Sequence, residues 1–238
     1  MILSKKHNFI FLKTSKTAGT SFEIALSKFL GHDDIITPIS PEDEALRAGL
    51  GFRGPQNHYS GWRAALHAVG ARSLRPTFYN HIPARDLLAL VGRPLFSGYQ
   101  KVSIVRNPYD MAISLFFWQH REQADLSLDR FRPWLLSRPS GLFKNRSITH
   151  VEDACVVDFM IRYEAFEEDI TAFSKRVGLP LSLYSEFASI QAKGQHRPKR
   201  ASTTTMFEGF EAGRSLIEDV FKDDILTYGY AIAPPAKG

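Results

Sequence analysis

The chain has 238 residues, of which 44% are hydrophobic and 23% are charged. This length can bury one substantial core, and it predicts a single globular domain spanning residues 1–238. The apolar runs are far shorter than the roughly 18 to 20 residues that cross a bilayer, so no membrane span is expected. The formal net charge of +5 is modest, and no recognition-helix, zinc-finger or RNP pattern accompanies it, so no nucleic-acid partner is expected.

The chain contains one cysteine, Cys155. A lone cysteine rules out an intramolecular disulfide and a cysteine metal cluster, which agrees with a reducing compartment. The first residues contain no apolar signal core, so a cytoplasmic location is expected. Apolar neighbours in residues 154–157 predict that Cys155 lies inert in the core. No metal cofactor is expected.

A strand, a turn and a helix are predicted in succession near the amino terminus. Residues 9–12 form the apolar run Phe-Ile-Phe-Leu, which predicts a buried strand, and residues 14–19 are small and polar, as a turn requires. From Ser21 onwards apolar side chains recur at helical spacing, which predicts a helix packed on a sheet. The first turn of such a helix carries unpaired N–H groups and the positive end of the helix dipole, and both favour an anion.

Polar side chains around this turn indicate a phosphate site. Lys16 adds a full positive charge, and Gly19 lets the backbone approach a ligand closely. Threonine and serine hydroxyls add hydrogen-bond donors. The expected phosphate contacts are Lys16, Thr17, Ala18, Gly19, Thr20 and Ser21.

Strands and helices alternate along the rest of the chain. Strands are expected at residues 77–80, 101–106 and 159–163, and helices from Ser40, over residues 62–69, 83–91, 109–120 and 212–221, and before Gly178. The alternation predicts an α/β protein with a P-loop-like three-layer fold, in which a central parallel β-sheet is flanked by helices. Ligands bind at the carboxyl ends of parallel strands, where Lys16, His81 and Arg106 are expected to lie.

Two segments interrupt this pattern. Residues 122–150 are polar and contain arginines beside Phe131 and Trp134, so they form either a substrate flap that contacts a sugar or a plain connection. Residues 188–207 contain four cationic side chains and no carboxylate, which favours an anionic ligand nearby.

Residues 16–21, Lys-Thr-Ala-Gly-Thr-Ser, resemble the 5′-phosphosulfate loop of sulfotransferases that use 3′-phosphoadenosine 5′-phosphosulfate (PAPS). The likeness is to the carbohydrate sulfotransferases, which include the Golgi heparan and chondroitin enzymes, and to their bacterial relatives. In that family a proline commonly precedes the lysine, where this chain has Ser15. The loop is not a Walker loop, whose lysine follows the second glycine, because here Lys16 precedes Gly19.

Residues 102–117 resemble the 3′-phosphate motif of the same family. In that motif a strand-terminal arginine and a helix serine eight residues later grip the phosphate, and here these are Arg106 and Ser114. An arginine in this position can present its planar fork to two phosphate oxygens. The alternative for Arg106 is a surface ion pair with Asp110. Met111 stands where relatives often carry an arginine.

The resemblance implies an enzyme that transfers a sulfuryl group from PAPS to a hydroxyl of a carbohydrate or glycan, with PAP as the product. Lys16 would stabilise the charge on the leaving phosphate, and His81 would take the hydroxyl proton, with His58 and His7 in reserve. The Golgi members of this family are typically anchored in the membrane. Because no membrane span is expected here, the resemblance implies a bacterial cytoplasmic member. Residues 188–207 would cover the nucleotide through the basic side chains Arg197, Lys199 and Arg200.

Two hypotheses of other classes stay open. A P-loop kinase or NTPase would share the strand, loop and helix, although no Walker B carboxylate is evident after a strand. A non-catalytic module could bind a nucleotide or a polyanion through the basic segment. The sequence does not define the acceptor or the oligomeric state.

Overall fold

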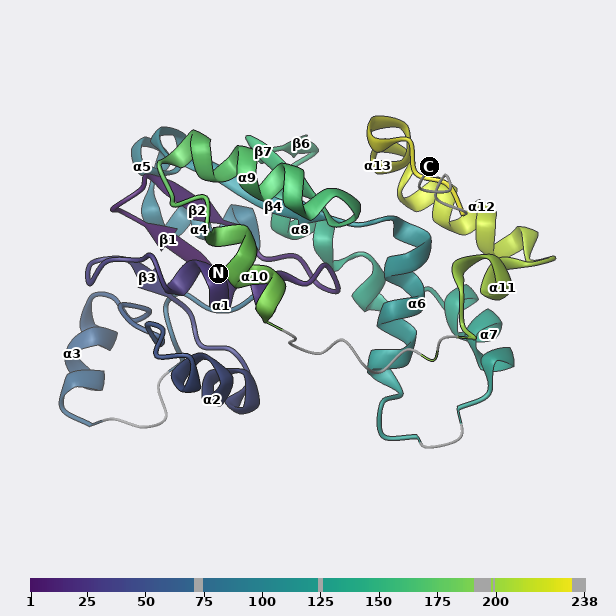
Figure 1. Ribbon diagram of the computed structural model, residues 1–238, viewed down its shortest axis with the longest axis horizontal. Helices are drawn as coiled ribbons and strands as arrows, with labels where there is room; N and C mark the ends of the chain where they lie inside the picture. Colours follow the sequence, from purple (N-terminus) through teal and green to yellow (C-terminus); the bar gives the residue numbers. More distant parts are fainter. Residues whose placement is uncertain (71–74, 124–125, 191–197, 199, 233–238) are drawn as a thin grey trace. The chain divides into compact units, whose positions relative to one another are not determined.

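Figure 1 shows the chain as a computed structural model, which describes residues 1–70, 75–123, 126–190, 198 and 200–232. The chain divides into two compact units. Met1–Ile104 and Arg146–Ala192 form unit 1, and Val105–Asn145 and Lys193–Gly238 form unit 2. The expectation that the whole chain is one domain stays a prediction.

Unit 1 is built on a five-stranded sheet with the strand order β3-β1-β2-β4-β7. The strands are β1 (Ile2–Ser4), β2 (Phe9–Phe11), β3 (Ile35–Ile36), β4 (Gln100–Val105) and β7 (Phe159–Arg162). β2 and β4 pair in parallel, whereas β1 pairs antiparallel with both β2 and β3. The expectation of a purely parallel sheet is therefore wrong. Only four residues join β1 to β2, and so short a turn can connect only antiparallel neighbours.

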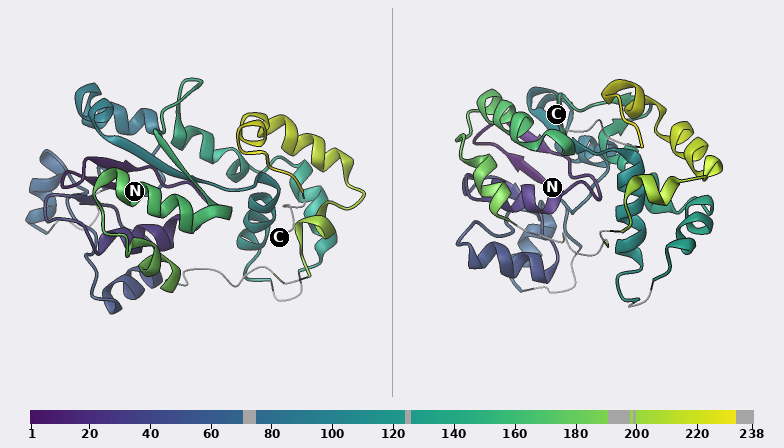
Figure 2. Two further views of the ribbon diagram at one scale, coloured as in Figure 1. Left: turned by 45° about the horizontal axis from the view of Figure 1, so that its top comes forward. Right: turned by 45° about the vertical axis from the view of Figure 1, so that its right-hand side comes forward.

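Helices cover both faces of this sheet (Figure 1, Figure 2), because the apolar strand residues alternate between two sides. Phe9 and Phe11 pack into one cluster, and Ile10 and Leu12 pack into another. The first cluster includes α1 (Gly19–Ser27), α9 (Phe166–Val177) and α10 (Leu183–Ser189). The second includes α4 (Ala84–Val91), α5 (Arg93–Gly98) and the end of α8 (Lys144–Thr149). Unit 1 is thus a mixed α/β structure.

The remaining elements of unit 1 lie outside the sheet. They are α2 (Pro41–Gly49), α3 (Trp62–Ala68), η3 (Tyr163–Ala165) and a hairpin of β5 (His150–Val151) and β6 (Ala154–Cys155). The expected capping of α2 is confirmed, since Ser40 accepts a hydrogen bond from the backbone N–H of Asp43. The expectation that Cys155 is buried is wrong, because both residues of β6 are exposed.

Unit 2 is helical. Its elements are α6 (Pro108–Gln119), η1 (Leu128–Arg130), α7 (Phe131–Leu136), η2 (Ser140–Leu142), α11 (Thr203–Phe207), α12 (Glu211–Val220) and α13 (Lys222–Tyr228). Asn107 and Pro108 start α6 within one residue of the expected helix at 109–120, and the asparagine side chain accepts from the N–H of Tyr109. The core of the unit stacks aromatic rings of Phe116, Phe131 and Phe207 edge to face. Within the described parts of both units, every helix is too short or too polar to cross a bilayer.

Candidate functional site

The carboxyl end of β2 is tied to β4 just before the predicted phosphate loop. The backbone N–H of Leu12 donates to the carbonyl of Val102, and Ser103 Oγ donates to the carbonyl of Leu12. Thr14 Oγ1 then donates to the carbonyl of Ile104 at 2.6 Å. These bonds extend the parallel pairing past the last strand residue, so they fix where residues 14–19 leave the sheet.

The predicted loop is confirmed as a tight turn that leads directly into α1. Lys16 and Ala18 adopt left-handed backbone conformations, with φ of 63° and 59°. Such conformations are uncommon for residues other than glycine, and they occur where the surrounding structure holds the backbone in place. Ala18 is the N-cap residue of α1 and has no side chain to cap the first turn. The N–H groups at this end of α1 therefore have no side-chain capping bond from that position.

Close packing at the start of α1 leaves little room for a side chain at Gly19. A Cβ atom there would lie 3.0 Å from Cγ of Lys13 and 3.3 Å from the carbonyl oxygen of Thr14. The aliphatic part of Lys13 thus runs directly beneath the first residue of the helix. The glycine expected from the motif has a structural reason in this chain, which is contact with the strand side of the loop.

The hydroxyl of Thr17 serves the loop itself. Thr17 is buried, and its Oγ1 lies 2.8 Å from Oγ1 of Thr14 and 3.3 Å from the carbonyl oxygen of Thr14. Because Thr14 already donates to Ile104, the proton shared by the two threonines comes from Thr17. The contribution of Thr17 to a ligand is therefore limited to its backbone. Ser21 is also buried, whereas Thr20 is partly exposed.

A buried ion pair lies under the loop and was missed in the sequence. Nζ of Lys13 lies 2.8 Å from Oε2 of Glu23, and both side chains are at most 2% exposed. The contact is a close charge pair whose angles are not those of a hydrogen bond. Burial, the largest influence, would raise the pKa of Glu23. The positive charges of Lys13, of the Met1 amino group at 3.0 Å from Oε1, and of Arg47 together outweigh burial, and the pKa falls to about 2. The sequence signal for a buried cation is a lone glutamate among the apolar and small residues of a predicted helix.

His81 lies beside the start of the loop, although the strand expected before it is absent. Residues 77–80 form no strand, because Pro76 and Pro83 lack backbone donors and the N–H of Phe78 donates to the carbonyl of His58. His81 sits in a turn with φ of 58°. Its Nδ1 lies 2.9 Å from the carbonyl oxygen of Lys13. A carbonyl can only accept, so Nδ1 carries the proton and the neutral ring has its lone pair on Nε2.

The reserve histidines have other surroundings. The ring of His58 lies 6.3 Å from that of His67, and burial followed by the charge of His67 lowers the pKa of His58. The ring of His7 lies against Phe9. Among the three candidates, His81 contacts Lys13, which adjoins the loop.

In unit 2, Arg106 follows the end of β4 and pairs with Asp110 on the first turn of α6. Nε of Arg106 donates to Oδ2 of Asp110 at 2.7 Å, and Nη2 reaches the same oxygen. Thr203 Oγ1 adds a contact of 3.3 Å to Oδ1. The ion pair considered from the sequence is therefore confirmed, and it fixes the plane of the guanidinium. Ser114 lies on α6, two turns further along, and is partly exposed.

The basic segment is described only in part. Arg197 and Lys199 lie outside the described residues, while Arg200 is exposed in a turn before α11. Met206 and Phe207, at the end of the segment, are buried in the core of unit 2. The assignment of this segment to a nucleotide stays a prediction.

Phe131 and Trp134 of the expected substrate flap pack into the core of unit 2. Phe131 is fully buried, so the expectation that it stacks on a sugar is wrong. Trp134 stacks on Phe131, and its Nε1 donates to Oε1 of Gln119. These contacts make α7 part of the unit 2 core, and a flap role for the rest of residues 122–150 stays a prediction.

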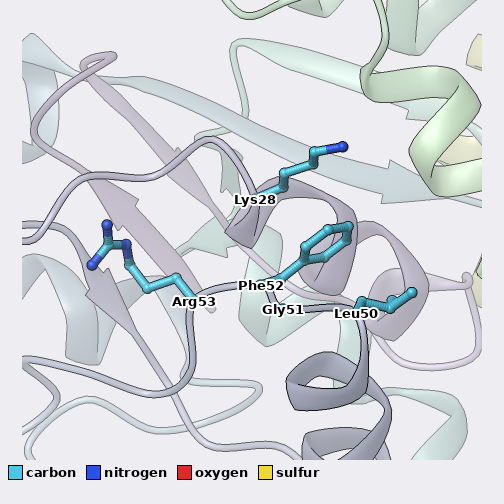
Figure 3. Close-up of a pocket in the computed structure, with 5 residues that line it drawn as sticks. All are labelled: Lys28, Leu50, Gly51, Phe52 and Arg53. Carbon is cyan, nitrogen blue, oxygen red and sulfur yellow. The ribbon is translucent and has the colours of Figure 1, made fainter.

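A pocket of about 530 Å³ lies in unit 1 at the other end of α1 from the loop (Figure 3). It is lined by Lys28, Leu50, Gly51, Phe52 and Arg53. Lys28 is already paired with Glu186, and its Nζ lies 5.4 Å from the ring centre of Phe52. Arg53 points away from these side chains in Figure 3 and donates to the carbonyl of Leu30. The pocket is therefore separate from the predicted phosphate loop.

The fold places the chain among mixed α/β proteins. No family model matches its sequence. A stretch of 107 residues is 30% identical to an uncharacterized protein of Archaeoglobus fulgidus, and the match covers 43% of this chain and 87% of the archaeal protein. The chain belongs to the family of that archaeal protein.

Proposed function

We propose that the protein is a PAPS-dependent sulfotransferase of the P-loop-like class. The observation that carries the proposal is the hydrogen bond between Nδ1 of His81 and the carbonyl of Lys13. It holds an imidazole, with its lone pair on Nε2, next to a strand–loop–helix turn that contains Lys16. The parallel pairing of β2 with β4 supports the same assignment.

Sulfuryl transfer needs a base, a cation and in-line geometry. In the proposed reaction the acceptor oxygen forms a bond to sulfur while the bond from sulfur to the phosphate oxygen breaks. Nε2 of His81 takes the hydroxyl proton, and Lys16 stabilises the negative charge that grows on the departing phosphate. The products are the sulfate ester and PAP. The acceptor is proposed to be a carbohydrate.

Arg106 and Ser114 are proposed to recognise the 3′-phosphate. Asp110 holds the guanidinium of Arg106 in a fixed orientation, which lowers the entropy that a phosphate contact would otherwise remove. The carboxylate of Asp110 is partly exposed. A bound phosphate would therefore either displace this carboxylate from the guanidinium of Arg106 or share the guanidinium with it.

Arg106→Ala should abolish a preference for PAP over AMP and ADP, neither of which has a 3′-phosphate. The expected loss of PAP affinity is about 1.5 to 3 kcal/mol, the size of a charge-assisted hydrogen bond. Isothermal calorimetry measures it. Arg162→Ala is the matched control, because Arg162 makes a similar pair with Asp169 in unit 1 and should leave the preference intact. Equal affinities of the unmutated protein for PAP and AMP would contradict the 3′-phosphate assignment.

Lys16→Ala should fold normally and lose about 10² to 10³ in kcat, the size expected when a group that stabilises transition-state charge is removed. Lys16→Asn is a second variant, because asparagine tolerates the left-handed backbone at this position. Lys28→Ala, at the other end of α1, is the control. If kcat stayed within about twofold while KM alone rose, Lys16 would bind both states equally and the proposed role would fail.

A thermal-shift titration with ATP, PAPS and PAP separates this proposal from a kinase or NTPase. Stabilisation by PAP and PAPS but not by ATP is expected. Transfer of labelled sulfate from PAPS to a panel of carbohydrates then separates an enzyme from a binding module. Stabilisation by ATP alone would overturn the assignment.

A further inference from the structure

Helix α3 presents an apolar face to solvent. Trp62, Leu66 and Val69 are 64%, 41% and 80% exposed, and they follow one another at i, i+4 and i+7, which places them on one side of the helix and its C-cap. No residue of α3 is buried. Figure 1 shows the helix at the margin of unit 1. An exposed apolar stripe of this kind is typical of a surface that contacts another protein, a membrane or a ligand.

The charged residues of the segment that carries α3 are arginines. Residues 45–85 contain six arginines and no lysine, aspartate or glutamate. On the helix itself the guanidinium of Arg63 lies 5.3 Å from the ring centre of Trp62, and Arg75 is exposed a few residues beyond. Arg47 is fully buried beside Glu44, so the positive field that attracts anions at this surface comes from Arg63 and Arg75.

The two ends of the segment that carries α3 are fastened together. The N–H of Phe78 donates to the carbonyl of His58, and the N–H of Ser60 donates to Oγ1 of Thr77. The ring of Tyr59 stacks on that of His67 at 4.2 Å. These contacts fasten α3 to the segment that precedes it, and the side chains of Trp62, Leu66 and Val69 remain exposed.

We propose that α3 docks on an anionic lipid surface, with Trp62, Leu66 and Val69 in the boundary of headgroups and acyl chains. Arg63 and the neighbouring arginines contact the phosphates. Tryptophan with aliphatic residues on one face and arginine beside it is the composition of helices that lie in a membrane interface. An acidic glycan would stack on Trp62 but would gain little from Leu66 and Val69. The inference is independent of the sulfotransferase proposal.

The test is co-sedimentation of the full chain with vesicles. Binding is expected to equimolar phosphatidylglycerol and phosphatidylcholine, and to weaken with added salt, but not to phosphatidylcholine alone. Trp62→Ser/Leu66→Ser should lower the partition coefficient by at least about tenfold, given the apolar area removed. Leu181→Ser is the matched control, because Leu181 is 56% exposed in unit 1 outside α3. Arg63→Glu should also weaken binding, whereas Lys175→Glu, at an exposed position of α9, should not.

Fluorescence locates the contact. Addition of anionic vesicles should shift tryptophan emission to the blue, and Trp62→Phe should abolish the shift while most of the binding remains, since phenylalanine keeps the apolar contact. Equal binding to both kinds of vesicle, no binding, or an equal loss in Leu181→Ser would overturn the proposal. Retention on a column of an acidic polysaccharide that depends on Trp62, without vesicle binding, would overturn it in favour of a glycan.

Discussion

Glu23→Gln should lower the free energy of unfolding by about 3 to 5 kcal/mol at pH 7, because it leaves the charge of Lys13 buried without its partner. Equilibrium denaturation in urea measures the loss. Replacing both members, as in Lys13→Met/Glu23→Leu, should recover only part of it, because Lys13 and Glu23 then leave no charge in the core but the buried amino group of Met1 loses its carboxylate partner. Glu186→Gln removes the carboxylate from the exposed pair with Lys28 and should change stability by less than about 1 kcal/mol.

The same pair predicts a dependence on pH. The pKa of Glu23 is lowered from 4.5 to about 2 in the folded protein, so the unfolded chain binds the proton more tightly. The stabilisation by Glu23 is therefore fully present above about pH 4.5 and is lost as pH falls towards 2. The difference in stability between the unmutated protein and Glu23→Gln should shrink over this interval. A difference that stayed constant down to pH 2.5 would contradict the assignment of the low pKa to Glu23.

The sequence predicted correctly those strands, turns and helices that depend on a local pattern of residues. The apolar run at residues 9–12, the small polar turn and the helix after it were confirmed, as were α2, α4 and α6 close to their expected bounds. β1 was missed because its three residues are too few to show a period. Its antiparallel pairing depends on the short turn to β2, so the mixed sheet could not be recognised from alternating strands and helices alone.

In the candidate site, too, local features were predicted and tertiary contacts were missed. The place of Lys16 and Gly19 in a turn before a helix was predicted because a turn and a helix start are local features. The Lys13–Glu23 pair was missed because it joins a strand end to a helix turn through tertiary packing. His81 was chosen on the basis of a strand that does not exist, yet it contacts Lys13, just before the loop, from a turn that the sequence did not indicate. The predictions that Cys155 is buried and that Phe131 stacks on a sugar were wrong, because burial depends on which elements pack over a residue.

His81→Asn should cut kcat by roughly 10² to 10⁴, the contribution of a general base. Asparagine can place its amide N–H where Nδ1 donates to the carbonyl of Lys13, and it tolerates the left-handed backbone of this turn. The variant therefore keeps the contact that positions the residue and removes only the lone pair of Nε2. His81→Ala should lose the same activity, and both variants should bind PAP nearly as tightly as the unmutated protein.

The asparagine variant separates catalysis from positioning. If His81 only fixed the loop, His81→Asn would retain its rate while His81→Ala lost it, and the role of base would have to move to His58 or a carboxylate. His58→Ala is the control and should keep kcat within about twofold, because His58 lies beside His67 and has no assigned step. The unmutated rate should fall at acid pH, where the imidazole of His81 is protonated and can no longer accept the hydroxyl proton. A rate that does not change as acid is added would exclude His81 as the base, whatever the variants show.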